Sequence, residues 1–593
     1  MRAPTSGSLP VPVRRSIGWG SKRYPSPSRF LDCPRMLARG RKKRYTLRLA
    51  TSPVLRVSCA HMAANEVAAP YSPSSETSVN PWLIAVIVSL AAFMEVLDTS
   101  IANVALPHIA GDLGASSDES TWVLTSYLVS NAIILPVSGW FVGIFGRKNF
   151  FMMCIIIFTL SSLFCGIAWS LGFLLFARIV QGAGGGGLQP MAQAILADTF
   201  SPEKRGLAFS LYGVTAIVAP SIGPTLGGWI TDNYSWRWIF YINLPVGLIA
   251  LFLVYKLIED PAYITRNLGR SLKVDYIGFS LLALGVGALQ ILLDKGQEDD
   301  WFGSNFIVAL TVIAVVCLVS LVFYEWRHTE PIVDVRLFKN VNFASANMVM
   351  FMVGAISFAS TVLMPQFLQT LMGYTAEKAG IVMSAAAMVL LMELPFVGQL
   401  TTRIQARYLI AFGWFALTCS MYYSTRRIDL QMSFASATWL RILQYVPLGF
   451  VFIPSSTAAY TGIAPEKNNA VAGLVNFMRN IGSSVGTSVV TTLLARRSQF
   501  HQDRLSETAS GLNSSFQASI NGIAQKLVQN GMNLADAQRH ALARYYAGLQ
   551  AQASTLAYID TYFVLAAAAG AMFLLSFTLR KNNPGKGPKV VSH

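Results

Sequence analysis

Charged residues are scarce in this sequence. Asp, Glu, Lys and Arg make up only 13% of its 593 residues, whereas hydrophobic residues make up 53%. An ordinary soluble domain carries about 25% charged residues. The composition therefore argues against a soluble fold and favours a protein whose solvent is the lipid bilayer.

Patterns typical of enzymes and metalloproteins are also missing. The six cysteines show no metal-ligand spacing, and the six histidines are scattered along the chain without an HExxH motif or a His-Cys cluster. No GxxxxGK[ST] phosphate loop occurs, and the GAGGGG run at Gly182 falls inside an apolar stretch, where it favours close helix packing. We therefore expect no enzyme, no metal site and no cofactor.

The net charge of +17 is concentrated at the start of the chain. Residues 1–61 hold 11 Arg and 3 Lys against a single acid, Asp32, which leaves only +4 for the other 532 residues. A nucleic-acid partner is therefore not expected. We interpret residues 1–80 as a basic disordered leader, with Met62 as the favoured true start. A transit-like peptide and a cytoplasmic tail that touches anionic lipid are the alternatives.

Apolar runs follow this leader at regular intervals. A helix needs about 20 apolar residues to cross a hydrocarbon core of about 30 Å. Windows of that length predict fourteen membrane-spanning helices, so the expected fold class is an all-α membrane protein with both termini on one side. The predicted spans are centred near residues 94, 131, 158, 186, 218, 248, 284, 314, 355, 388, 416, 449, 484 and 568.

Basic residues in the short loops predict which side that is. Most of them fall in the loops on the side of the termini, which is therefore the expected cytoplasmic side. These residues are Arg147, Lys148, Lys204, Arg205, Arg266, Arg270, Lys273, Arg327, Arg336, Lys339, Arg403, Arg407, Lys467, Arg580 and Lys581. We expect a multi-pass protein of the bacterial inner membrane with both termini cytoplasmic.

An internal repeat divides the chain. Pro107 near the end of span 1 returns as Pro365, 258 residues later, and Gly139 returns as Gly398, 259 residues later. The repeat predicts a 6+2+6 arrangement of two six-helix halves, residues 81–258 and 341–580, joined by two linker helices in residues 259–340. Residues 581–593 form the expected tail. Duplicated halves favour a rocking transporter with its ligand site between them.

Small residues and prolines mark span 5. Its sequence GVTAIVAPSIGPTLGGW repeats Ala219, Gly223 and Gly227 every four residues, so that another helix can approach this face closely. Pro220 and Pro224 each remove a backbone donor and are expected to bend the helix. A kinked packing helix is one interpretation, and a hinge or seal between the halves is the other.

Several motifs together resemble a known family. They are LDTSIANVALP in span 1, G-x6-GRK after span 2, RxxQG in span 4, GPxxGG in span 5 and WRWIFxINxPxG in span 6. With fourteen spans, this set resembles the fourteen-spanner drug/proton antiporters of the major facilitator superfamily, the EmrB type, over about residues 80–580. The resemblance implies a proton-coupled exporter of amphipathic drugs. It also implies that certain residues hinge or gate the halves, namely Gly139, Gly146, Arg147, Lys148, Pro220, Gly223, Pro224, Gly227 and Gly228. Family members often carry an acid at the position of Gly143, so no latch built on that acid is expected here.

Two acids stand in an otherwise apolar span. Glu95 and Asp98 are three residues apart and share a helix face. An ionised side chain at mid-bilayer costs about 2.5 to 3.5 kcal/mol on insertion scales, so such groups usually face a cavity or a partner. Burial raises the pKa of a carboxyl group and a nearby cation lowers it, which suits a proton carrier. We expect Asp98 and Glu95 to couple protons, with Arg178 as the counter-charge that the resemblance places in the cavity.

The second half also carries intramembrane charges. Glu393 precedes Pro395 closely, and we expect it to contact the substrate together with Asn103 and Gln181. Arg479 is expected to form a structural ion pair or to lie near the headgroups. A small-molecule drug, protons and the bilayer are the expected partners.

The predicted external loop 497–556 is the longest segment between spans. Its segment LADAQRHALARYYAGLQAQ has helical spacing. In exporters of the resembled type a similar loop meets a membrane-fusion adaptor, which leads to an outer-membrane channel; a solvated flap is the alternative. An uptake carrier of the same superfamily is the alternative function, and a membrane-embedded enzyme or receptor is a third class that the missing catalytic motifs argue against.

Overall fold

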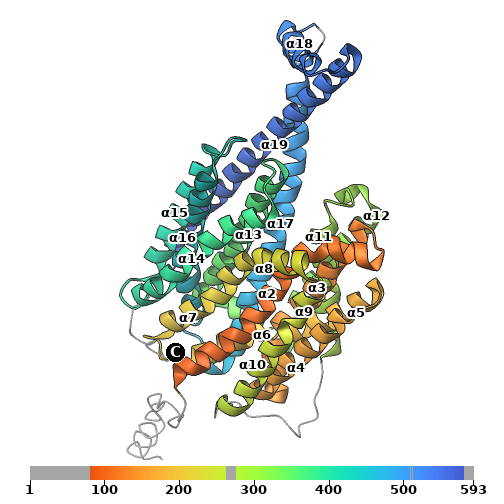
Figure 1. Ribbon diagram of the computed structural model, residues 1–593. Coiled ribbons are helices and arrows are strands. Elements are labelled where there is room, and N and C mark those ends of the chain that lie inside the picture. Colours follow the sequence, from red (N-terminus) through yellow and green to blue (C-terminus); the bar gives the residue numbers. More distant parts are fainter. Residues whose placement is uncertain (1–79, 262–274, 508, 511, 580–593) are drawn as a thin grey trace, which may run out of the picture. The chain divides into compact units, whose positions relative to one another are not determined.

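The computed structural model describes residues 80–261, 275–507, 509–510 and 512–579. Throughout this described part of the chain, the regular elements are helices (Figure 1). The predicted leader with Met62, the tail 581–593 and the loop residues Arg266, Arg270 and Lys273 lie outside it.

The helices follow one another with short connections. In chain order the α-helices are α2 (Pro81–Leu113), α3 (Ser117–Phe145), α4 (Arg147–Gly166), α5 (Leu171–Gly185), α6 (Leu188–Thr199), α7 (Arg205–Gly213), α8 (Ala219–Asn233), α9 (Trp238–Tyr241), α10 (Asn243–Leu257), α11 (Tyr276–Lys295), α12 (Asn305–Arg327), α13 (Val341–Thr370), α14 (Ala376–Leu400), α15 (Ala406–Thr425), α16 (Phe434–Ala459), α17 (Asn468–Ser506), α18 (Ser514–Gln529) and α19 (Leu534–Leu575). A π-helical turn, η1 (Val214–Val218), joins α7 to α8. Four 3₁₀ turns complete the set, η2 (Trp301–Gly303), η3 (Val335–Lys339), η4 (Pro465–Lys467) and η5 (Ser576–Thr578).

Twelve helical segments of the described chain are long and apolar enough to cross a membrane. They coincide with twelve of the fourteen predicted spans. The two remaining predicted centres, residues 416 and 484, fall in α15 and α17, which are also helical. The membrane-spanning, all-helical class is thus confirmed, and the count of fourteen stays a prediction.

Two of the segments are irregular where their sequences are unusual. Predicted span 4 is split into α5 and α6 at Gly186 and Gly187, within the GAGGGG run. A Cβ atom on Gly184 would lie 2.8 Å from the backbone nitrogen of Phe158 in α4, so the glycines permit close helix packing as predicted. Predicted span 5 contains η1 directly before Pro220, whose ring nitrogen has no proton to donate to the helix.

The helices pack in two groups. Helices α2–α10, the first helical group, pack against one another, and so do α13–α17 with α19, the second helical group. Helices α11 and α12 pack together, and α11 also contacts α3 and α17. The two groups meet where α3 and α6 contact α17, and where α7 and α8 contact α14.

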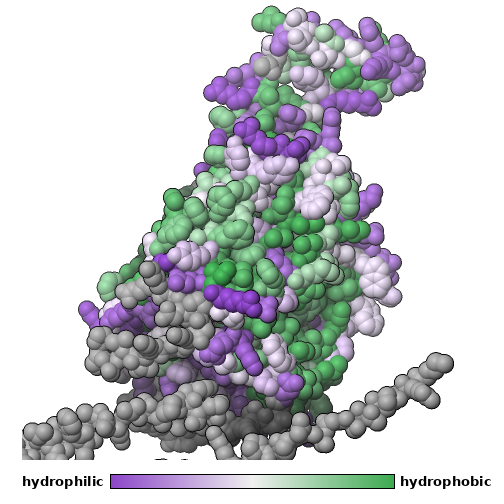
Figure 2. Space-filling model, turned by 90° about the vertical axis from the view of Figure 1, so that its left-hand side faces the viewer, coloured by the Kyte–Doolittle hydropathy of each residue, from purple (hydrophilic) through white to green (hydrophobic). Residues whose placement is uncertain are grey.

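Large apolar side chains remain exposed along the helices. Helix α12 has many of them on its outer surface, including Phe306, Val312, Val315, Val319 and Phe323. Figure 2 shows hydrophobic residues spread over one face of the long helices, with hydrophilic residues gathered around the end that carries α18. Such a continuous apolar surface suits contact with lipid.

Helices α17 and α19 are longer than a bilayer requires. At about 1.5 Å per residue, their 39 and 42 residues span about 58 and 63 Å. Helix α18 packs on α19 through a small apolar cluster of Ala524, Leu527, Ala537 and Ala541. The predicted loop 497–556 is therefore largely helical, and the helical spacing predicted for its second part is confirmed by α19.

Candidate functional site

Helix α2 places both predicted acids inside the first helical group. Asn80 caps the start of this helix, because its side chain accepts a hydrogen bond from the backbone nitrogen of Trp82. Pro81 is the first residue of the helix. Glu95 and Asp98 lie one turn apart and are only 3% and 2% exposed. Because α2 contacts α3, α6, α8 and α10, both carboxylates are enclosed by protein and do not face lipid.

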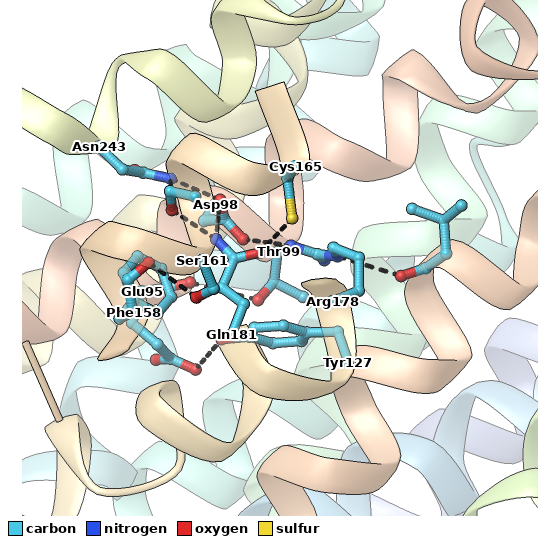
Figure 3. A network of polar contacts seen from close by, with 12 residues as sticks. Glu95, Asp98, Thr99, Tyr127, Phe158, Ser161, Cys165, Arg178, Gln181 and Asn243 are labelled. Carbon is cyan, nitrogen blue, oxygen red and sulfur yellow. Dashed lines mark hydrogen bonds and ion pairs between the residues drawn. The ribbon is translucent and has the colours of Figure 1, made fainter. Parts of the chain in front are cut away.

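Asp98 lies at the centre of a polar network (Figure 3). Its Oδ2 atom pairs with Nη1 of Arg178 at 2.7 Å. Its Oδ1 atom accepts hydrogen bonds from Nδ2 of Asn243 at 2.6 Å and from Nε2 of Gln181 at 3.1 Å. Gln181 also accepts from Arg178 at 2.6 Å and donates to the Ser162 hydroxyl at 2.7 Å. The predicted counter-charge and a predicted substrate residue thus both contact Asp98.

The Arg178 side chain is fully buried and has further neighbours. Its Nε donates to the carbonyl oxygen of Val123 at 3.1 Å. The rings of Tyr127 and Phe240 lie 4.3 and 5.5 Å from the guanidinium carbon. An ion pair removed from water is stable only when additional hydrogen bonds satisfy both partners, and this one has them on the carboxylate and on most of the guanidinium. Loss of the charge on Asp98 therefore leaves a buried cation without its counter-charge.

Glu95 has a separate set of donors. The Tyr127 hydroxyl and Nδ2 of Asn131 donate to Oε1 at 2.9 and 3.0 Å. Nε2 of Gln189, on α6, donates to Oε2 at 2.6 Å. In the described part of the chain, three neutral donors and no direct cation surround this carboxylate, in contrast to Asp98.

Through Gln189 the Glu95 network reaches the second helical group. The Gln189 Oε1 atom accepts hydrogen bonds from Arg479 of α17 and, at 3.2 Å, from the hydroxyl of Tyr212. The same hydroxyl lies 2.8 Å from Oδ1 of Asn476 of α17, so its single proton is shared between these two acceptors. Arg479 is only 8% exposed. Among the described residues Arg479 forms no ion pair and its guanidinium donates to an amide, whereas its expected position near the headgroups stays a prediction.

Some of these contact residues were not among the predicted site. Asn243 stands in the WRWIFxINxPxG motif, whose asparagine could have been singled out. Gln189, Tyr212 and Asn476 have no comparable signal, since each is a polar residue in an apolar segment of ordinary appearance. Only packing brings them together.

Two predicted substrate residues lie apart from these networks. The carboxylate of Glu393 on α14 faces Gly449 of α16, and both of its oxygens are buried without a hydrogen-bond partner in the described part of the chain. The Asn103 side chain, five residues after Asp98 on α2, is exposed and takes no part in either network. Gln181, the third, is held in the Asp98 network.

The predicted loop motif forms a contact between the groups. Nη1 of Arg147 pairs with Asp198 of α6 at 2.5 Å, and its Nε donates to Asn469 of α17 at 3.0 Å. A Cβ atom on Gly139 would lie 3.0 Å from the backbone of Ala470 in α17. Arg147 and Gly139 therefore both stand where α3 and α4 approach the second group.

Two further residues of that motif have local roles. Gly146 has φ +78°, a conformation that residues with a side chain rarely adopt, and it separates α3 from α4. Lys148 is turned away from the second group. Its backbone nitrogen donates to Asp260 at 2.7 Å, and its Nζ donates to the Tyr255 carbonyl at 2.7 Å.

Helix α8 is packed between α2 and the second helical group. On one side Gly223 and Gly227 lie so close to Ser100 and Ile101 of α2 that a Cβ atom would not fit without movement, and Ser100 donates to the Pro220 carbonyl at 2.8 Å. Gly228 is less tightly packed, and Pro224 lies within the helix. On the other side, Thr225 and Ser384 of α14 form a hydrogen bond at 3.1 Å. The predicted close helix approach is confirmed, and the partner is α2.

The chain is similar to known proteins. A model of the Major Facilitator Superfamily matches residues 88–487. The multidrug export protein EmrB of Escherichia coli (strain K12) is 37% identical over 436 residues, which cover 74% of this chain and 84% of EmrB. The probable multidrug resistance protein EmrY of the same strain is 38% identical over 448 residues, or 76% of this chain and 87% of EmrY.

A solved structure shows the same fold. The proton:xylose symporter XylE of the major facilitator superfamily, bound to 6-bromo-6-deoxy-D-glucose, has a TM-score of 0.54 at 13% identity. The match covers 86% of this chain and 98% of XylE. At this identity the likeness concerns the fold alone.

Proposed function

The chain belongs to the major facilitator superfamily, and from this membership we propose that it is a proton-coupled antiporter that exports amphipathic drugs or toxic small molecules. Membership makes it a multi-pass membrane transporter with an all-α major facilitator fold, which confirms the expectation of a transporter and not an enzyme. Export is proposed because two similar proteins are named for multidrug export and multidrug resistance.

The observation that carries the proposal is the buried Asp98–Arg178 ion pair. A proton that binds Asp98 removes the negative charge and so releases Arg178 from its partner. When the proton leaves, the pair forms again, together with the hydrogen bonds from Asn243 and Gln181. The site thus has two arrangements, with Asp98 either paired with Arg178 or protonated and unpaired, and the proton selects between them. Proton coupling requires such a switch.

Glu95 connects this chemistry to the movement of the two groups. Gln189 holds Glu95 with one end of its amide and accepts from Arg479 of the second group with the other. Separation of the groups breaks the contact with Arg479 and changes the surroundings of Glu95. We assign Glu95 the role of a second proton-coupling acid that senses whether the groups are in contact.

Residues 81–258 and 341–580 are proposed as the two halves that rock, with residues 259–340 as the linker. The contacts between the groups support this division. Arg147 and Gly139 meet α17, and α8, with Pro220, Pro224 and its glycines, packs against α14. These contacts are the proposed gates, which open alternately.

Glu393 is the proposed substrate contact of the second half. Its carboxylate has no protein partner among the described residues. A cationic group of a substrate can therefore pair with it without displacing a protein group. Asn103 and Gln181 are proposed to contact substrate in other stages of the cycle, since Gln181 is engaged with Asp98 in this conformation.

The proposed location is the bacterial inner membrane, with both termini in the cytoplasm. The basic short-loop residues support this orientation. The end of α17, α18 and the start of α19 then extend outside, where they are a suitable surface for a membrane-fusion adaptor that leads to an outer-membrane channel. No nucleotide is needed: one proton that moves down about 100 mV and one pH unit supplies about 2.3 and 1.4 kcal/mol, which supports a gradient of several hundredfold.

The test is efflux from cells and vesicles that contain the wild type, Asp98→Asn or Glu95→Gln. Vesicles with the wild type should release protons when a lipophilic cation is added. Asp98→Asn should abolish proton-driven efflux while the protein remains in the membrane. Full efflux by Asp98→Asn, or wild-type accumulation that is indifferent to collapse of the pH and voltage gradients, would exclude the proposed coupling.

A further inference from the structure

The second helical group repeats the arginine–glutamine motif of the first. RILQ at residues 441–444 of α16 follows RIVQ at residues 178–181 of α5 by 263 residues. In both motifs Nη1 of the arginine donates to Oε1 of the glutamine, at 2.6 Å in α5 and 3.0 Å in α16. Each glutamine then donates to a serine hydroxyl, Ser162 at 2.7 Å and Ser424 at 2.9 Å. The two groups therefore contain the same buried cation site.

The two sites differ in their negative charge. Arg178 has Asp98 as its partner, whereas Arg441 contacts only neutral groups. Nη1 of Arg441 donates to the backbone oxygen and hydroxyl of Ser360 at 2.9 and 3.1 Å, and Nη2 donates to the hydroxyl of Thr361 at 2.9 Å. Among the residues that the structure describes, none forms an ion pair with Arg441.

Arg441 is also fully buried, which makes the missing anion costly. Its side chain has no exposed surface, and its Nε–H has no hydrogen-bond partner within the described ranges of the chain. Glu393, an acid of the same group, faces Gly449, about two turns further along α16, and does not pair with Arg441. Buried charges in membrane proteins are as a rule paired or functional, and this one has no charged partner in the part of the chain that the structure describes.

We propose that Arg441 binds the carboxylate of amphipathic anionic substrates. This inference rests on the proposed export function and adds a substrate class to it. The Nε–H, which has no hydrogen-bond partner among the described residues, shares one edge of the guanidinium with Nη2, and a carboxylate binds this edge with two hydrogen bonds. The present acceptor of Nη2 is the Thr361 hydroxyl, a neutral group that a carboxylate can replace. The Tyr445 ring, 4.2 Å from the guanidinium carbon, supplies an apolar wall for the adjoining hydrocarbon chain.

Access to Arg441 depends on the contact between the two groups. The Tyr445 hydroxyl lies 2.6 Å from the hydroxyl of Ser221 in α8 and 3.0 Å from that of Thr361. Tyr445 therefore reaches across the boundary next to the guanidinium. When α8 moves away from α16, this contact opens and the cation comes within reach of a ligand between the groups.

The test is direct binding of a fluorescent carboxylate, 11-(dansylamino)undecanoic acid, to purified full-length protein in detergent, compared with its uncharged N-methyl amide. The wild type should prefer the acid. Arg441→Gln should lower this preference about tenfold or more, because a charged double hydrogen bond is lost, and Arg441→Lys should retain part of it. Monodisperse elution and the melting temperature report whether each variant is folded.

Thr361→Asp tests the charge while the arginine is retained. An aspartate beside Nη2 supplies an internal anion, as Asp98 does for Arg178, so the preference for the acid should fall about as far as in Arg441→Gln. A folded Thr361→Asp or Arg441→Gln variant with the wild-type preference, or a wild type with no preference, overturns the proposal. The binding measurement uses no proton gradient, so its result does not depend on whether the protein couples transport to protons. Conversely, a failure to bind the acid does not decide whether the protein exports cations, which the efflux test measures separately.

Discussion

Glu95 and Arg479 lie on opposite sides of one amide. Gln189 donates to the Glu95 carboxylate at 2.6 Å and accepts from the Arg479 guanidinium, although the acid belongs to the first helical group and the arginine to the second. A neutral group thus separates two opposite charges at the boundary between the groups. The groups can therefore separate here without pulling a direct ion pair apart, which suits a contact that breaks in the proposed transport cycle.

Gln189→Leu tests this bridge. The substitution leaves Glu95 and Arg479 without one hydrogen bond each, and each such bond to a charged group contributes about 1.5 to 3 kcal/mol. We expect proton-driven drug efflux to fall at least tenfold at unchanged expression. Gln290→Leu is the matched control, because Gln290 bonds to Ser484 of α17 without contact to either acid. Similar losses in both variants would show that Gln189 has no special role.

Asp98 and Arg178 should depend on each other for stability. Asp98→Asn leaves a buried guanidinium without its anion, and breaking a buried pair in this way costs about 3 to 5 kcal/mol. We expect a clearly lower melting temperature for Asp98→Asn and a partial recovery when Arg178→Gln is added. Efflux should remain absent in the double variant, because no proton site is restored. A recovery of efflux with stability would assign Asp98 a purely structural role.

Helix α8 offers a matched pair of glycines. A Cβ atom at Gly223 would overlap the Ser100 side chain of α2, whereas one at Gly228 would lie 3.9 Å from Val104, an ordinary contact. Gly223→Ala should therefore be destabilising, by about 1 to 3 kcal/mol if it resembles other overpacked sites. Gly228→Ala should be neutral or slightly stabilising, since alanine favours helix by up to about 1 kcal/mol. Melting temperatures of the two purified variants measure the difference, and equal values would contradict the packing described.

Gly143 and Asp198 allow a rescue experiment. Asp198 pairs with Arg147, while Gly143, one turn before Arg147, has open space around it. Asp198→Asn should lower transport severalfold because the buried guanidinium of Arg147 loses its anion. Adding Gly143→Asp, which supplies the acid that the family resemblance leads one to expect at this position, should restore part of the activity. The measured quantity is the efflux rate at equal expression; no change in the first variant would exclude a role for this pair in gating.

The sequence by itself determined that this chain lies in a membrane, where most of its helices run and which acids are buried. In lipid, the backbone N–H and C=O groups of an apolar run of about 20 residues must bond to one another, as they do in a helix. The length and composition of these runs were therefore sufficient to predict the membrane helices. The close approach of α8 to another helix could also be predicted from the sequence, because small residues at every fourth position lie on one face of the helix.

The tertiary structure alone decided which polar groups meet. Asp98 and Arg178 are 80 residues apart, and Gln189 and Arg479 are 290 apart. The sequence did not predict the partner of Arg479, because a lone arginine in an apolar helix does not show which way it points and a neutral amide such as Gln189 gives no distinctive signal. Helix packing fixes such partners, since a buried polar group must find its hydrogen bonds among whatever side chains the fold brings beside it.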